Sequence, residues 1–141
     1  MKVLRWKEFL SVHDPIIDNQ HKELFELTNQ LISNSNADSH SPIVGETLKD
    51  LLKYARKHFK VEERFLERVG YPKLKEHKKM HADFTLQVAM FCKDVMDRKT
   101  NVTEEMINYL VTWLVSHVSK EDIDFKNYIS QEVRPLEKKR E

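Results

Sequence analysis

The sequence of 141 residues has little of what builds several other classes of protein. It contains one cysteine, two glycines and four prolines. The single cysteine, Cys92, excludes an intrachain disulfide and a metal site built from cysteines. No apolar run approaches the roughly 20 residues of a membrane-spanning helix, and the charged first residues lack the apolar core of a signal peptide. We therefore expect a cytoplasmic protein that has no membrane as a partner.

The chain also lacks an excess of charge of one sign. Lysine and arginine total 24, against 23 aspartates and glutamates, which gives a formal net charge of +1. Without a strong net field, nucleic acid is not an expected partner. With 40% hydrophobic and 33% charged residues, the composition is typical of one globular domain, and the scarcity of glycine and proline favours helix.

Four stretches carry apolar residues at steps of three and four, which is the period of an amphipathic helix. Asp14 and Pro15 open the first as an N-cap and a first helical residue. The expected helices cover approximately residues 14–32, 42–70, 74–98 and 101–131, the last one capped by Asn101 or Thr103. Because the connecting loops are short, these stretches predict an all-α fold, an antiparallel up-down four-helix bundle.

The ends of the chain do not share this helical period. Residues 1–13 hold aromatic side chains without a regular spacing, and we expect them to form an N-terminal arm packed along the outside of the bundle. Residues 132–141 are almost all charged and form an expected tail. The predicted organisation is therefore one domain, 1–141, with an arm, a bundle over 14–131 and a charged tail.

The apolar faces of the predicted helices carry polar residues that an ordinary core does not contain. They are His21, His58, Glu62, His77, His81, His117 and Asp122. A single histidine on such a face is more often a hydrogen-bonded core residue than a ligand. The combination is different, because burying one unpaired carboxylate already costs several kcal/mol.

The spacing of these residues favours a shared site. His58 and Glu62 are four residues apart, and so are His77 and His81, so each pair projects from one face of its helix. Each predicted helix supplies at least one such side chain.

The last two candidate ligands have a different spacing. His117 and Asp122 are five residues apart, which is not an α-helical repeat. We expect a helix that bends or ends between them, so that both side chains still point inward. Five imidazoles and two carboxylates exceed the four ligands of one zinc ion and suit two bridged metal ions. Nitrogen and oxygen donors without thiolate favour iron, with manganese or zinc as alternatives.

Five segments of the sequence resemble the hemerythrin family, and the match extends in order from about Trp6 to Ile129. These segments are Ile17–Phe25, His58–Glu63, Tyr71–Pro72, His77–His81 and Trp113–Asp122. Within the family, the chain looks most like the stand-alone bacteriohemerythrins.

This resemblance implies a non-haem di-iron centre that binds dioxygen reversibly, in an oxygen carrier, storage or delivery protein rather than an enzyme. By the family pattern, one iron is held by His77, His81 and His117, and the other by His21 and His58. Glu62 and Asp122 bridge the two irons together with an oxo or hydroxo group, and dioxygen takes the open position on the second iron. The resemblance also implies an apolar oxygen pocket, formed by Leu24, Phe59, Trp113, Leu114 and Val118.

Some interpretations stay open at this point. The five pocket residues fit ordinary core packing as well, and Asp18 either orients a ligand imidazole or favours the first turn of its helix. His13 and His40 are not expected ligands, and Cys92 is expected to be buried and inert. The lysines between residues 57 and 79 alternate with glutamates and indicate a solvated face.

Two other classes of function also remain. The same centre could reduce oxygen, peroxide or nitric oxide, with electrons from a separate donor protein. Alternatively, it could act as an oxygen or redox sensor that reports to a partner. A carrier would in turn need a protein that receives its oxygen.

Overall fold

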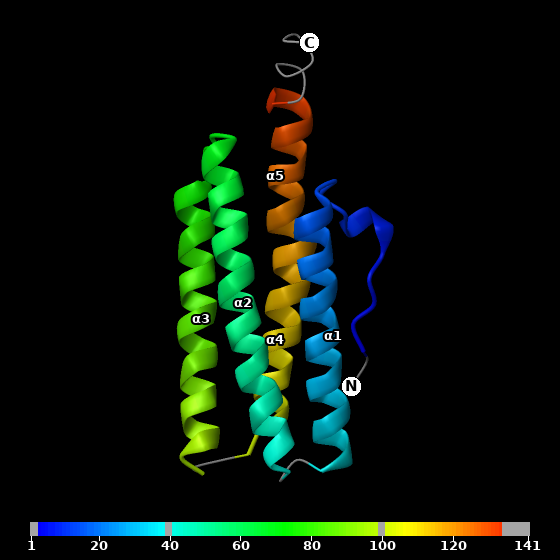
Figure 1. Ribbon diagram of the computed structural model, residues 1–141, viewed down its shortest axis with the longest axis vertical. Coiled ribbons are helices and arrows are strands. Elements are labelled where there is room, and N and C mark those ends of the chain that lie inside the picture. The colour runs from blue at the N-terminus through cyan, green and yellow to red at the C-terminus, as the bar shows by residue number, and fades with distance from the viewer. Residues whose placement is uncertain (1–2, 39–40, 99–100, 134–141) are drawn as a thin grey trace.

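The computed structural model describes residues 3–38, 41–98 and 101–133, and most of them are helical. The long helices are α1 (Pro15–Ala37), α2 (Pro42–Arg68), α3 (Leu74–Met96) and α4 (Glu104–Ser116). The fourth continues through a π-helical turn, η2 (His117–Glu121), into α5 (Asp122–Tyr128) and a second π-helical turn, η3 (Ile129–Val133). Successive long helices run in opposite directions, and α4 to η3 form one rod (Figure 1). This arrangement confirms the predicted up-down four-helix bundle.

Local signals in the sequence fix where the helices begin. The Asp14 carboxylate accepts hydrogen bonds from the backbone N–H groups of Ile16 and Ile17, both at 3.0 Å. At α4, the Thr103 hydroxyl accepts from the backbone N–H of Met106 at 3.2 Å, so Thr103 is the cap residue. Each bond satisfies a donor in the first turn that has no partner within the helix.

The end of α2 also follows from its sequence. Gly70 comes just after α2 and has a φ of 71°, in the left-handed region that favours glycine. The chain can therefore turn there toward α3.

Apolar side chains fill the bundle interior in two main layers. The larger cluster includes Leu31, Leu48, Leu51, Phe84 and Leu110, and it occupies the half of the bundle toward the start of α2. A second cluster lies at the other end and contains Ile17, Leu66, Tyr71, Phe125 and Ile129, with Val12 of the arm. Helix α1 packs on α2 and α4, and α2 packs on α3.

The arm runs along α1 (Figure 1) and includes a short 3₁₀ turn, η1 (Glu8–Leu10). Its backbone is held by Asn29, whose side-chain oxygen accepts from the Leu4 N–H at 2.7 Å and whose amide group donates to the Leu4 carbonyl at 2.8 Å. The Trp6 ring also packs edge-on against Phe25, with centroids 6.0 Å apart.

Within the described ranges, no helix is long and apolar enough to cross a membrane.

Candidate metal centre

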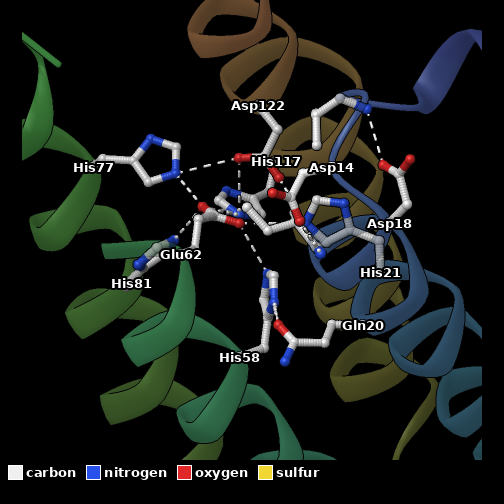
Figure 2. Close-up of polar contacts among 12 residues, drawn as sticks. Asp14, Asp18, Gln20, His21, His58, Glu62, His77, His81, His117 and Asp122 are labelled. Atoms are coloured by element: carbon white, nitrogen blue, oxygen red, sulfur yellow. Dashed lines mark hydrogen bonds and ion pairs between the residues drawn. The ribbon is translucent and has the colours of Figure 1, made fainter. Parts of the chain in front are cut away.

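All seven candidate ligands converge at one place inside the bundle (Figure 2). Each is at most 2% exposed. Helix α1 supplies His21, α2 supplies His58 and Glu62, α3 supplies His77 and His81, and the α4–α5 rod supplies His117 and Asp122. The pairs spaced by four residues on α2 and α3 project inward because they repeat at the helical period.

The spacing of five between His117 and Asp122 is accommodated by the π-helical turn η2. The backbone N–H of Asp122 donates to the carbonyl of His117, which is the i to i+5 bond of a π-helix. The wider turn keeps both side chains on the inner face without interrupting the rod. Both side chains point inward as expected. The expectation that the helix bends or ends between them is wrong, because a π-helical turn brings them to the same face.

The two carboxylate oxygens of Glu62 divide the five imidazoles into two groups. Oε2 faces His58 Nε2 at 2.9 Å and His21 Nε2 at 3.3 Å. Oε1 lies against the Nε2 atoms of three other rings, those of His77, His81 and His117. A group of two and a group of three imidazoles thus share one carboxylate.

Asp122 lies between the same two groups of imidazoles. Its Oδ2 is 2.8 Å from His21 Nε2. Its Oδ1 is 3.2 Å from His77 Nε2 and 3.3 Å from His117 Nε2. Asp122 therefore faces both groups of imidazoles, as Glu62 does.

Several of these buried atoms lack a hydrogen-bond partner among the described residues. They are His58 Nε2, His81 Nε2, both ring nitrogens of His117, His21 Nδ1 and both oxygens of Asp122. Buried polar atoms are normally satisfied, so a set without partners needs another explanation. Imidazole nitrogens and carboxylate oxygens are good donors to a divalent transition metal. The Nε2 atoms of the five rings and the oxygens of the two carboxylates face one another around a common centre.

Two overlapping sets of donors have the proximity that a metal ion needs. One set is His21, His58, Glu62 and His117, and the other is Glu62, His77, His81 and His117. In each set, the ligand atoms lie within 4.8 Å of one another. The chain thus contains histidine–glutamate clusters that could hold metal.

The two carboxylates are ionised in spite of their burial. Burial raises the pKa of a carboxyl group, but the imidazoles of His117 and His58 outweigh it and hold the pKa of Glu62 well below its usual range. The pKa of Asp122 is also lowered, because His117 and His21 outweigh both burial and the charge of Glu62.

The imidazoles of the cluster respond to the same carboxylates. Burial alone lowers the pKa of a histidine, as it does for His58. At His21 the charges of Asp122 and Glu62 outweigh burial and raise the pKa to about 10, and hydrogen bonds to the same carboxylates do so at His77. The two carboxylates therefore stabilise positive charge on the rings of His21 and His77.

Two residues that the sequence interpretation missed orient the ligand rings. His58 Nδ1 is 2.8 Å from Gln20 Oε1, and His81 Nδ1 is 2.8 Å from Glu63 Oε2. Because an amide oxygen and a carboxylate can only accept, Nδ1 of each ring is the donor, which leaves the Nε2 lone pair for a metal. Their spacing gives a partial signal, since each directly precedes or follows a candidate ligand.

Asp18 does not orient an imidazole. Its carboxylate accepts from the Ser11 hydroxyl at 2.6 Å and from the backbone N–H of Val12 at 2.9 Å. Asp18 therefore holds the arm against the first turn of α1, and the hypothesis that it orients a ligand imidazole is wrong.

The two histidines that were not expected to be ligands lie outside the cluster or outside the described residues. His13 is exposed in the arm, and His40 lies outside the described residues.

Aromatic rings cover one side of the cluster. Phe59 stacks on His81 with centroids 3.9 Å apart, and the half-buried Trp113 stacks on His117 at 4.6 Å. Leu24 and Leu114 are fully buried in the larger apolar cluster. Val118 packs in a different place, with Leu10 and Phe25 beneath the arm.

Cys92, expected to be buried and inert, is half-buried, and burial raises the pKa of its thiol. The thiol is therefore not activated toward the thiolate form at neutral pH.

Comparisons with known proteins agree with this fold and centre. Residues 13–129 match the family model described as the hemerythrin HHE cation-binding domain. A bacteriohemerythrin of Clostridium acetobutylicum is 32% identical over 125 residues, which cover 85% of this chain and 96% of that protein. A myohemerythrin of Theromyzon tessulatum is 33% identical over 122 residues, covering 86% and 90%.

A solved structure gives the same result in three dimensions. The crystal structure of a wild-type hemerythrin superposes with a TM-score of 0.81 at 26% identity, covering 90% of this chain and 95% of that one. The fold and the buried cluster define a helical cation-binding domain. Within that class, the chain belongs to the hemerythrin family.

Proposed function

We propose that this protein binds dioxygen reversibly at a di-iron centre. The observation that carries the proposal is the division of the five imidazoles into a group of two and a group of three by the oxygens of Glu62. Two groups of nitrogen donors that share two carboxylates match the needs of two adjacent, inequivalent metal ions.

Each ligand has a specific role in this proposal. His77, His81 and His117 would hold one iron, His21 and His58 would hold the other, and Glu62 and Asp122 would bridge them. When bound, a pair of irons with an oxo or hydroxo group would supply the reversible two-electron chemistry that binding of dioxygen needs. Neutral imidazoles outnumber the carboxylates, and this balance favours Fe(II) and therefore release of oxygen over its further reduction.

The surrounding side chains keep water from the centre. Phe59 and Trp113 cover His81 and His117 with their ring faces, and Leu24 and Leu114 close the interior on the side of the larger apolar cluster. Val118 seals the side beneath the arm. Excluding water and protons protects a bound oxygen species from release in a reduced form.

An anaerobic optical titration tests this function. The protein is loaded with Fe(II), its spectrum is recorded, air is admitted, and the sample is then purged with argon. We expect a visible charge-transfer band that appears with air and disappears on purging, and we expect His58→Ala to abolish it. An irreversible diferric spectrum formed within seconds would contradict reversible binding and favour an oxidase or a sensor.

A further inference from the structure

The groove between α2 and α3 approaches the metal centre from outside. Phe59, Glu63 and His81 line it. Phe59 stacks on the His81 ring with the two planes 8° apart, and Glu63 accepts the hydrogen bond from His81 Nδ1. A single imidazole ring therefore separates the groove from the Nε2 atom that faces Glu62.

The two sides of the groove differ in their chemistry. The α3 side is mainly apolar: Ala82, Leu86 and Ala89 lie there beside Thr85, and Leu86 is 64% exposed. The other side and the rim carry the exposed cations Arg56, Lys60 and Lys78. A small apolar contact area bordered by charges of one sign is typical of transient protein–protein encounters.

The cationic side continues along the outer face of α2. Lys53, Lys57, Lys60 and Arg64 follow one another at steps of four, three and four, so they share an exposed face, with Arg56 beside them. Within the described part of the chain, no carboxylate forms an ion pair with these cations.

The acidic residues that alternate with them in the sequence do not neutralise this face. Glu62 is buried in the metal centre, and Glu63 turns toward His81. The solvated surface that the sequence predicts is confirmed, since its lysines and the carboxylates of Glu67 and Glu76 are exposed. Within that surface, the residues from Lys53 to Arg64 form a row of exposed cations on the outer face of α2.

We propose that this groove is the docking surface for an acidic protein that carries one electron, and that electrons reach the metal centre through His81. The inference rests on the proposed di-iron function, since only a redox-active centre would need an electron donor. In this step, two reduced carriers would each lose one electron and a pair of Fe(III) ions would gain the two electrons, while one proton taken from water would balance the charge and leave hydroxide in solution. Such a step would return an oxidised protein to the state that binds oxygen.

The test uses an acidic [2Fe–2S] ferredoxin as the probe and the iron-loaded chain of 141 residues in its oxidised state. Calorimetry at low ionic strength measures the affinity for oxidised ferredoxin, a readout that involves no electron transfer. Stopped-flow absorbance then measures the rate at which reduced ferredoxin reduces the centre. The variant is Arg56→Glu/Lys60→Glu. The control, Arg5→Glu/Lys7→Glu, makes the same change in net charge on the exposed arm, which lies beside α1 (Figure 1).

The groove variant should bind ferredoxin at least about tenfold more weakly and be reduced more slowly by a similar factor, because like charges now face each other. In the arm control, the affinity for ferredoxin and the rate of reduction should change by less than about twofold. Added salt should narrow the difference in affinity between the arm control and the groove variant. An equal loss in both variants, or no loss in either, would overturn the proposal. Tighter binding of a short DNA duplex than of ferredoxin at this face would overturn it as well.

Iron content and the optical oxygen cycle are recorded for every sample, and these results separate the two hypotheses. A chain that holds no iron or shows no reversible band contradicts the proposed function. A chain that holds two irons and cycles with oxygen, but whose ferredoxin binding ignores Arg56 and Lys60, contradicts the docking surface alone.

Discussion

Helix α2 has two halves whose buried faces follow the same period but hold different chemistry. Leu48, Leu51 and Ala55 fill the first half, and His58 and Glu62 continue the same face in the second half, each of them 0% exposed. The helical geometry does not distinguish the halves. In the first, burial of apolar surface contributes stability. In the second, buried charge has to be compensated by partners, and a bound cation is the partner that these donors match.

The metal centre depends on the apolar layers around it. Below the centre lies the larger cluster of leucines, and above it lies the cluster around Phe125 and Leu66. These layers supply the folding free energy that offsets the cost of burying the ligand side chains. The two halves should therefore fail in different ways when they are changed.

The largest effect is expected from Glu62→Gln, which keeps the size of the side chain but removes the charge that faces all five imidazoles. We expect iron content to fall from two ions per chain to one or none, measured by a colorimetric iron assay. Glu67→Gln alters an exposed carboxylate on the same helix and should keep both irons. Retention of two irons in Glu62→Gln would contradict the bridging role.

In the leucine half, Leu51→Ala should destabilise the fold without emptying the centre. Removing a buried leucine leaves a cavity, and we expect a loss of about 2–5 kcal/mol in the free energy of unfolding. Urea denaturation measures this loss, and iron content should stay at two. Leu86→Ala, at an exposed position of α3, should change stability by less than about 0.5 kcal/mol.

Gln20→Leu tests the support of the ligand rings. Without the acceptor for His58 Nδ1, that ring loses its orientation, and affinity for Fe(II) should fall about 10- to 100-fold. Competition with a coloured chelator measures the affinity. Asn19→Leu, a change at the exposed neighbouring residue, serves as the control. Equal affinities in the two variants would show that Gln20 does not position the ligand.

The smallest effect is expected from Asp18→Asn, at a residue near the centre that faces the arm. Losing a charged acceptor for Ser11 and Val12 should lower stability by about 1 kcal/mol. Hydrogen exchange at the Val12 amide should accelerate, whereas iron affinity should stay the same. A large drop in iron affinity would return Asp18 to the group of residues that orient ligands.

Much of the architecture could be predicted because its signals are local. Asp14, Pro15 and Gly70 mark helix ends through cap chemistry and a positive φ. The buried faces follow from the period of apolar residues, and His58 and Glu62 belong to that period. Five imidazoles on such faces are unusual enough to indicate a shared centre.

What could not be predicted depends on the packing of separate segments. The π-helical turn at His117 departs from the α-helical period, so the spacing alone could not distinguish a bend from a wider turn. Gln20 and Glu63 lie within their helices, at the border between the buried and the exposed face. At such a position, only the placement of the neighbouring helix decides which ring the side chain contacts. The role of Asp18 depended on the path of the arm, and no period specifies that path.

Anomalous diffraction at the iron absorption edge, from crystals of the iron-loaded protein, tests the central claim most directly. We predict two peaks between Glu62 and Asp122, one next to His21 and His58 and the other next to His77, His81 and His117. A single peak bound by both groups of imidazoles, or peaks elsewhere on the protein, would contradict the di-iron centre.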